Sequence, residues 1–369
     1  MSQCTLPVSP IAGKFLGSRD RLVVAGNGPL SSVGIQCVIQ DADTGENSFK
    51  NVCEYSSYGT CTAMEICGVS RLAKSFIALA NSEYSGNGNS SIALLEVETD
   101  ISEASMKYTH SLKSVSCASY TSLSFYNEQE LLAGSSDSGC VILWDLHTGR
   151  EIRRFAADSS GINKLEFTRS GQLLTCGMST SAQLHIWDIR TNLSSSSISS
   201  SPPLVDTTPR LVVSAARCFR HPDKKEVGFG IQQQQQQPSS HVFYTSISSQ
   251  SLYNKIACGT CRGSVAIWDL RVDAVMEFYP HSPRSTVSAV LAHPWNQDLL
   301  ISASSSGHVR SSDLASLSLT RGVRESFSEK DGAIISDSGG ITSLDCDRDS
   351  GMLLAVSSLG ALWRLQLDK

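Results

Sequence analysis

Short apolar segments alternate with tight polar turns along most of the chain, and one arrangement of them recurs. In four places an apolar strand and a turn of glycine, serine or aspartate lead into a second strand with an aspartate next to its last residue. This order of strand, turn and strand is typical of a β-hairpin. A recurring unit of this kind indicates a repeat fold. The four second strands read GCVILWDL (139–146), AQLHIWDI (182–189), GSVAIWDL (263–270) and GHVRSSDL (307–314).

Three weaker copies of the hairpin occupy residues 22–41, 76–98 and 352–367. Most copies follow one another at close to the roughly 40–45 residues of a four-stranded propeller blade. Seven hairpins therefore predict an all-β fold, a seven-bladed WD-repeat β-propeller. The positions equivalent to the tryptophan of the Trp-Asp pair are predicted to be Ile39, Leu95, Trp144, Trp187, Trp268, Ser312 and Leu365.

One step of the repeat, from Trp187 to Trp268, is longer than the others. The segment between them contains a nearly pure serine tract at 194–201 and a glutamine run at 232–237. Tracts of this composition have no residues that could form a core. We interpret the step as one blade with low-complexity loop insertions at about 191–205 and 226–250, within a single domain that spans 1–369.

The inner strand of each blade is expected to precede its hairpin, with apolar residues at alternate positions. Pairs of this kind are Leu123/Phe125, Leu165/Phe167, Ala289/Leu291 and Leu344/Cys346. His221-Pro222 and His293-Pro294 are expected to end two inner strands, because a terminal proline removes no ladder donor.

Ring closure is predicted to need the N-terminal segment. The last hairpin copy ends close to Lys369, after what would be the third strand of its blade. We expect the segment near Thr5–Phe15 to supply the missing outer strand, since a blade cannot bury its apolar faces alone.

The Trp-Asp pairs are interpreted as structural positions. A planar tryptophan on the third strand is expected to wedge between adjacent sheets, where its truncation would remove a core side chain. The positions assigned to this role are Trp144, Asp145, Trp187, Asp188, Trp268, Asp269 and Asp313.

Composition excludes several classes of function. Hydrophobic residues make up 40% of the chain, which is enough for a core, and the formal net charge is −5. A protein with this charge has no basic field for holding nucleic acid. The chain has neither an apolar run long enough for a membrane helix nor a basic and apolar leader. We therefore expect an address in the cytoplasm or nucleus.

The 12 cysteines are too scattered for a disulfide framework. We expect those in apolar runs to be buried thiols, namely Cys37, Cys140, Cys176, Cys218, Cys258 and Cys346. The motif GTCRG (259–263) matches the outline of a nucleophile elbow, but it aligns with the hairpin turns of the repeat. Cys258 and Cys261 form a C-x₂-C without a second pair, which is insufficient for a zinc site.

No other catalytic pattern is evident. The histidines form no metal motif, and His281 and His293 are expected to be structural hydrogen-bonding residues. A propeller hydrolase would need convergent carboxylates or histidines at the channel-facing strand starts, where we expect serine, alanine, leucine and threonine. The prediction is a binding protein without enzymatic activity, cofactor or metal.

The Trp-Asp pairs at the ends of hairpins resemble those of WD-repeat proteins over residues 115–315. The stretch ADSSGINKLEFTRSGQLLTCGMSTSAQLHIWDIR (157–190) is further similar to a blade of the small WD-repeat nucleoporins of the outer-ring Y complex. The matches continue in the same order with CFRHPD, GSVAIWDLR and AHPWNQDLLISASSSGHV. The chain departs from that pattern in its two insertions, in Ser312-Asp313 replacing Trp-Asp, and in a shorter N-terminal segment.

This resemblance implies a non-catalytic scaffold subunit of the nuclear pore complex in the nuclear envelope, and a presence at kinetochores in mitosis. Its implied partners are the other outer-ring nucleoporins. Its implied role is to support mRNA export and protein import through protein contacts, without direct nucleic-acid binding or membrane insertion.

Two other binding functions stay open. The sequences after Trp187 and Trp268 read WDIR and WDLR, and they resemble the WDxR motifs of substrate receptors for cullin ubiquitin ligases. In those receptors the arginine contacts the adaptor, which here would assign that role to Arg190 and Arg271. The simpler interpretation is that both arginines solvate a blade edge. A generic scaffold in chromatin or trafficking is the remaining alternative.

Overall fold

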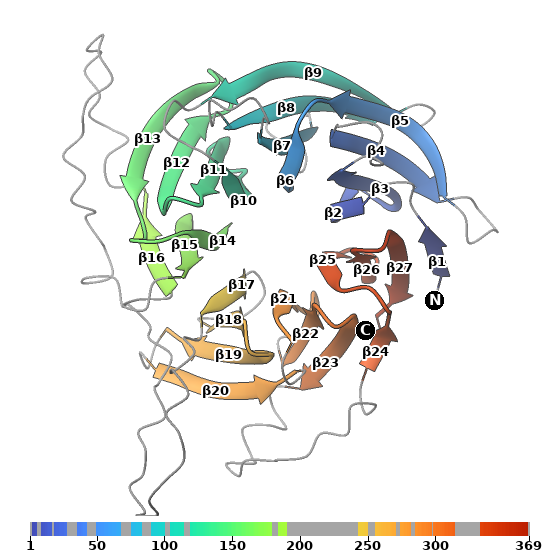
Figure 1. The fold of residues 1–369 in the computed structure, drawn as a ribbon, viewed down its shortest axis with the longest axis vertical. Helices are drawn as coiled ribbons and strands as arrows, with labels where there is room; N and C mark the ends of the chain where they lie inside the picture. Colours follow the sequence, from blue (N-terminus) through green and yellow to red (C-terminus); the bar gives the residue numbers. More distant parts are fainter. Residues whose placement is uncertain are drawn as a thin grey trace, which may run out of the picture.

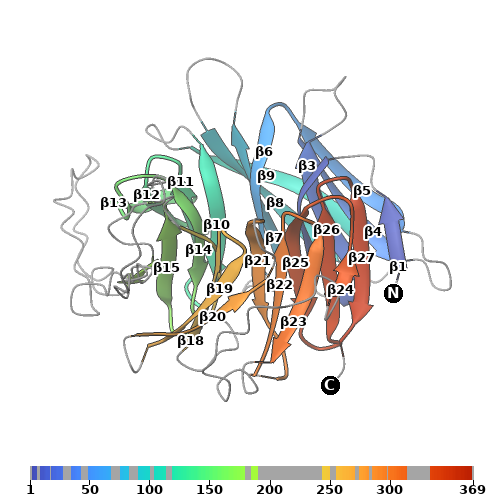
Figure 2. The ribbon, with the colours of Figure 1, turned by 60° about the horizontal axis from the view of Figure 1, so that its bottom comes forward.

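The computed structural model describes residues 2–5, 9–16, 18–27, 35–42, 49–67, 75–82, 90–99, 104–113, 119–178, 184–189, 243–249, 255–270, 274–281, 285–296, 298–313 and 333–367. These residues form 27 β-strands and no helix. The strands assemble into seven antiparallel sheets arranged around a central axis (Figure 1). Figure 2 shows the strands running between the two faces of the ring. An all-β propeller is thereby confirmed.

Each sheet is one blade, and consecutive strands pair from the axis outward. Blade 1 has β2 (Ser9–Leu16), β3 (Ser18–Asn27), β4 (Ile35–Ala42) and β5 (Phe49–Ser57). Blade 2 has β6 (Thr60–Cys67), β7 (Ser75–Ser82), β8 (Ser90–Thr99) and β9 (Ala104–Lys113). Blade 3 has β10 (Tyr120–Tyr126), β11 (Leu131–Ser136), β12 (Cys140–Asp145) and β13 (Arg150–Ala156).

Blade 4 has three strands within the described residues, β14 (Ile162–Phe167), β15 (Gln172–Gly177) and β16 (Leu184–Asp188). Blade 5 has β17 (Tyr244–Ser248), β18 (Lys255–Thr260), β19 (Ser264–Asp269) and β20 (Ala274–Pro280). Blade 6 has β21 (Val287–Ala292), β22 (Leu299–Ser304), β23 (His308–Asp313) and β24 (Ala333–Ser336). Blade 7 has β25 (Ile341–Asp347), β26 (Met352–Ser357), β27 (Ala361–Gln366) and, from the other end of the chain, β1 (Ser2–Thr5).

The N-terminal strand closes the ring. β1 pairs antiparallel with β27, from Ser2 opposite Arg364 to Thr5 opposite Ala361. The predicted closure is correct, but the predicted segment is wrong beyond Thr5. Residues 9–16 instead form the inner strand of blade 1, where Phe15 lies opposite Leu22. One short strand is sufficient to close the ring, because β27 lacks hydrogen-bond partners only along its outer edge and β1 supplies them.

The inner strand of blade 5 is another correction. It is β17, which lies inside the range 226–250 predicted as an insertion. Its buried residues are Tyr244, Ser246, Ile247 and Ser248, and Ser249 stands where Phe125 and Phe167 stand in blades 3 and 4, so the apolar pair that reveals those inner strands is incomplete. His293 directly follows β21 as predicted, whereas His221 and Pro222 lie outside the described residues.

The three tryptophans of the Trp-Asp pairs pack between neighbouring blades. Trp144 is 1% exposed and joins a cluster that includes Ile92 and Leu94 of blade 2. The ring centroid of Trp187 lies 4.8 Å from that of Phe155 in blade 3. Each indole therefore fills the gap between two sheets, where burial of an aromatic ring contributes strongly to the core.

Strand register supports the predicted tryptophan-equivalent positions in blades 2 to 7, and shifts the one in blade 1. Leu22 lies opposite Gln40, whereas the equivalent Leu132 of blade 3 lies opposite Trp144. Ile39, the predicted equivalent, lies opposite Val23. The error arises because the position in blade 1 is occupied by a polar residue, Gln40, directly after an apolar one, Ile39, in a hairpin without a Trp-Asp pair.

Candidate functional site: the central channel

The seven inner strands surround a central cavity of about 410 Å³. They are β2, β6, β10, β14, β17, β21 and β25, and all lie around the axis in Figure 1. A cavity lined by every blade is the natural place to look for a site in a propeller.

Every inner strand has an irregularity in its pairing at the same place, and β2 has a second one between Phe15 and Leu16. The pairing with the second strand skips one residue near the start of the inner strand, which is a β-bulge. The skipped residues are Ile11, Thr62, Thr121, Asn163, Thr245, Ser288 and Thr342, and all of them line the cavity.

Several of the bulge residues bond to the next blade. The Asn163 side-chain amide donates to the Tyr244 carbonyl at 2.6 Å. The Thr245 hydroxyl donates to the Val287 carbonyl at 2.6 Å. These side chains satisfy backbone carbonyls on the inner edge of a sheet, where no further strand is present.

A second ring of equivalent positions lies three residues beyond the bulges. Its side chains carry most of the charge in the channel. In blade order the residues are Lys14, Glu65, Ser124, Glu166, Ser248, Leu291 and Asp345.

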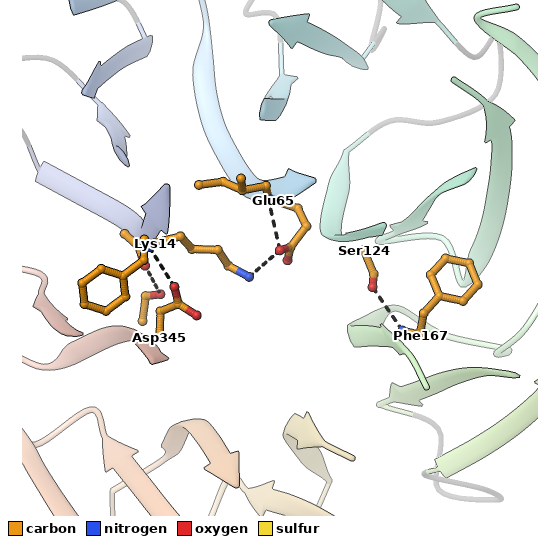
Figure 3. Close-up of polar contacts among 9 residues, drawn as sticks. Lys14, Glu65, Ser124, Phe167 and Asp345 are labelled. Carbon is orange, nitrogen blue, oxygen red and sulfur yellow. Dashed lines mark hydrogen bonds and ion pairs between the residues drawn. The ribbon is translucent and has the colours of Figure 1, made fainter. Parts of the chain in front are cut away.

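Four members of this second ring accept a hydrogen bond from a backbone amide of the next blade. Ser124 Oγ accepts from Phe167 N at 3.1 Å, and Asp345 Oδ2 accepts from Phe15 N at 2.8 Å (Figure 3). Glu166 accepts from Ser249 N at 2.9 Å. Ser248 Oγ accepts from Ala292 N at 3.2 Å. In each case the donor amide belongs to the residue that directly follows, in the sequence, the second-ring residue of the next blade.

The junction between blades 1 and 2 follows a different scheme, because the ammonium group of Lys14 cannot accept. Lys14 Nζ instead forms an ion pair with Glu65, and Glu65 Oε1 also accepts from the amide of Ile66 at 3.2 Å (Figure 3). Although burial lowers the pKa of Lys14, the charges of Glu65 and Asp345 outweigh burial and raise it. Lys14 therefore stays charged and paired with Glu65.

The remaining channel charges are held at a desolvation cost. Burial raises the pKa values of Glu166 and Asp345 and lowers the pKa of Lys164. Within the described residues no three His, Cys, Asp or Glu side chains come together as a metal site. The channel carboxylates are thus used mainly as acceptors that join blades.

These charged positions were missed by the sequence analysis, which placed only serine, alanine, leucine and threonine in the channel. Glu166 lies between Leu165 and Phe167, and Asp345 lies between Leu344 and Cys346. In these two blades the signal was therefore present, as the residue between the two apolar residues that marked the inner strand. Charged residues at these positions are tolerated because they face the cavity and cap free amides.

Replacement of Asp345 tests this role. Asp345→Ala leaves the amide of Phe15 without its acceptor, so the free energy of unfolding should fall by about 1–3 kcal/mol in urea denaturation. Asp345→Asn keeps an acceptor oxygen and should cost clearly less. Equal losses in the two variants would show that the charge of Asp345, rather than the hydrogen bond, is important.

His281 forms part of the junction between blades 5 and 6. Its backbone amide donates to the Gly263 carbonyl at 2.7 Å, and its ring contacts Ser302 Oγ at 2.8 Å and the His308 carbonyl at 3.3 Å. His293 Nδ1 accepts from the amide of Asn296 at 3.1 Å. Both histidines are structural hydrogen-bonding residues, as predicted.

Acid should weaken the fold through His281. Burial, with the nearby charge of Arg310, lowers the pKa of His281 to about 4. The unfolded chain, with a pKa near 6.5, binds more protons between pH 4 and 6.5, so stability falls as pH decreases through that range. The contribution of His281 between pH 7.5 and pH 5 is about 2 kcal/mol. His281→Gln should remove that part of the pH dependence in urea titrations, and an unchanged pH dependence would refute the assignment.

The aspartates of the Trp-Asp pairs occupy different environments. Asp145 Oδ1 accepts from the amides of His147 and Thr148, at 2.8 and 3.1 Å, and so holds the following turn. Asp269 is fully buried, Asp188 is partly buried and Asp313 is exposed. None of these residues lines the channel.

The two arginines predicted to contact an adaptor, Arg190 and Arg271, lie outside the described residues. The structure therefore does not test that prediction.

The described cysteines with a raised pKa are poor nucleophiles. Cys176 and Cys258 are fully buried, and Cys140 and Cys346 are partly buried. The side chain of Cys37 and the whole of Cys218 lie outside the described part. Burial raises the pKa of Cys176 and of Cys346 to about 12, which keeps these thiols protonated at neutral pH.

The GTCRG motif is a hairpin turn, as expected. Cys261 lies between β18 and β19, and Gly263 has a φ of 79°, the left-handed conformation that glycine adopts most easily. Because a strand and not a helix follows it, the motif lacks the setting of a nucleophile elbow.

A family model described as "Nucleolar protein 10-like, N-terminal domain" matches residues 122–364. The chain belongs to this family. The matched residues run from β10 to β27 and so include blades 3 to 7. This is a β-propeller family, in agreement with the observed fold. A search of curated proteins found no match. The described residues contain no helix that is long and apolar enough to cross a membrane.

Proposed function

We propose that the protein is a non-catalytic scaffold of the nucleus that holds other proteins on the outside of its propeller. We further propose that residues 1–369 form a single propeller domain. Membership of a nucleolar β-propeller family supports a nuclear protein-binding role.

The observation that carries the proposal is the use of the channel carboxylates. Glu166 and Asp345 bond to backbone amides of the next blade, and Glu65 is paired with Lys14. A general acid or base must instead be free to reach a substrate proton. These contacts make the channel a structural axis, and function is left to the faces and the rim.

Within the nucleus, we propose the outer ring of the nuclear pore as the site of action. The support is the resemblance of residues 157–190 to a blade of the outer-ring nucleoporins. In the structure this stretch takes in β14, β15 and β16 of blade 4. The protein would then support transport of mRNA and protein by building the pore, and would follow its complex to kinetochores in mitosis.

A nucleolar scaffold is the second candidate, favoured by the description of the matching family. The two candidates share the binding role and differ in address and partners. A receptor for a cullin ligase adaptor, acting through Arg190 and Arg271, is a third outcome that the same experiment detects.

The test is to tag the full-length chain in cells, locate it by fluorescence, and identify its partners after purification with nuclease treatment. The pore proposal predicts signal at the nuclear rim and recovery of outer-ring nucleoporins. Nucleolar signal with nucleolar partners would replace it by the second candidate. Recovery of a cullin adaptor that is lost in Arg190→Ala/Arg271→Ala, with nuclear-rim signal absent, would favour the third.

A further inference from the structure

The outer strands of blades 1, 2 and 3 form a continuous arc on the rim of the ring (Figure 1). The rings of Tyr55 on β5 and Tyr108 on β9 stack with centroids 6.3 Å apart and planes 3° apart. β9 also reaches blade 3, because a Cβ on Gly149 would lie only 2.7 Å from His110 Nε2. Gly149 immediately precedes β13, so the three outer strands present one surface, here called the outer rim.

The outer rim exposes side chains typical of protein interfaces. Tyr108 is 47% exposed and Ile152 is 42% exposed, and both are among the few large apolar side chains on the described surface. Lys107 and Arg150 are exposed beside them, and Arg153 lies over the ring of Phe155 at 5.9 Å. Aromatic and arginine side chains are enriched in interface cores and among the residues that dominate binding energy.

The charge of β13 indicates the kind of partner. The strand carries Arg150, Arg153 and Arg154 against one acid, Glu151, in a chain whose formal net charge is −5. Arg154 is paired with Glu151 at 2.7 Å. Arg150 and Arg153 form no ion pair with any described residue, so they are available to an acidic partner. Complementary charge of this kind selects partners and speeds their association.

The backbone of β13 offers a second means of recognition. Its sheet has the order β10-β11-β12-β13, so β13 is the edge strand of blade 3 in the described part of the chain. An exposed edge strand has a row of free amides and carbonyls that an extended segment can pair with. The outer rim thus combines a strand edge, an exposed isoleucine and unpaired arginines.

We propose that the outer rim docks an acidic, extended segment of a partner protein, which adds to the edge of β13 and contacts Ile152, Arg150 and Arg153. This inference deepens the proposed scaffold function, on which it rests. Nucleic acid is disfavoured, because two unpaired arginines are far fewer than the phosphate contacts of nucleic-acid-binding proteins and the chain is acidic overall.

The test compares two triple variants of the tagged full-length chain in nuclease-treated purifications. The rim variant is Arg150→Glu/Ile152→Glu/Arg153→Glu. The control is Arg169→Glu/Arg262→Glu/Leu359→Glu, which makes the same charge change at three exposed turn positions away from β13. The rim variant should recover at least tenfold less of the outer-ring nucleoporins than the wild type, and the control should stay within twofold of it. Zero-length carbodiimide coupling should link Lys107 to partner carboxylates in the wild type.

The recovery of partners by these variants supports or overturns the rim proposal. Equal recovery by the wild type and a folded rim variant would overturn the proposal, as would an equal loss in the control. If the rim variant does not fold, Arg150→Ala/Arg153→Ala replaces it, with an expected loss of at least threefold.

If the wild type recovers nucleolar proteins that only the rim variant loses, the pore assignment fails and the rim proposal holds. Loss of all wild-type partners on nuclease treatment would indicate nucleic acid and overturn it, and recovery of no partner by the untreated wild type would contradict both proposals.

Discussion

Replacement of Trp144 by alanine is expected to lower the free energy of unfolding by about 3–5 kcal/mol, the range for deletion of a buried aromatic side chain. Trp144 is 1% exposed, and its ring meets that of Tyr120 edge-on at 5.7 Å. Its cluster includes side chains of two blades, so the cavity left by the indole cannot be filled by movement of one sheet alone. Urea denaturation followed by circular dichroism measures the loss.

Leu359→Ala is the matched control for that experiment. Leu359 is 68% exposed in a turn of blade 7, and surface truncations of this kind usually change stability by less than about 0.5 kcal/mol. A Trp144→Ala variant as stable as the Leu359→Ala variant would show that the indole does not hold blades 2 and 3 together.

Removal of residues 1–5 is expected to lower the thermal midpoint by about 5–10 °C, because four residues of strand pairing are lost and β27 becomes an open edge. The deletion stops at Thr5, since residues 9–16 are the inner strand of blade 1 and their loss would destroy a blade. Differential scanning calorimetry of the purified chain gives the midpoint.

The control for this deletion keeps the backbone and changes the side chains. Replacing Ser2–Thr5 by Thr-Val-Thr-Val retains the pairing with β27, so its midpoint should stay close to that of the wild type. A deletion that leaves the midpoint unchanged would mean that the ring does not depend on β1.

The sequence was sufficient to predict the propeller because its hairpins repeat with turn residues and Trp-Asp pairs in equivalent places. Trp144, Trp187 and Trp268 are large enough that only a gap between two sheets can hold them. In the structure each of the three lies in a cluster that contains side chains of two neighbouring blades.

Other elements could not be predicted because their stability comes from distant partners. β17 is built on Ser246 and Ser248, whose hydroxyls bond to blade 6, so hydrophobic alternation does not reveal it. The exact closing strand was also beyond the sequence, since β1 pairs with a strand more than 350 residues away. Short segments with weak local preference take their structure from such contacts.

The candidate site was likewise predictable only in part. Glu166 and Asp345 occupy positions adjacent to residues that the sequence analysis singled out, but their role depends on amides of the next blade. Similarly, the outer rim depends on the contact between β5 and β9 and on the approach of β9 to the turn before β13, which only the three-dimensional arrangement provides.

The central claim is that seven sheets form one closed ring, joined between the two ends of the chain. Hydrogen–deuterium exchange of the intact protein tests it most directly, at the amides of β27 and of β1. The account predicts slow exchange in both strands, comparable to that of β26, and fast exchange in β27 once residues 1–5 are removed. Fast exchange of β27 in the intact protein would contradict the closed ring.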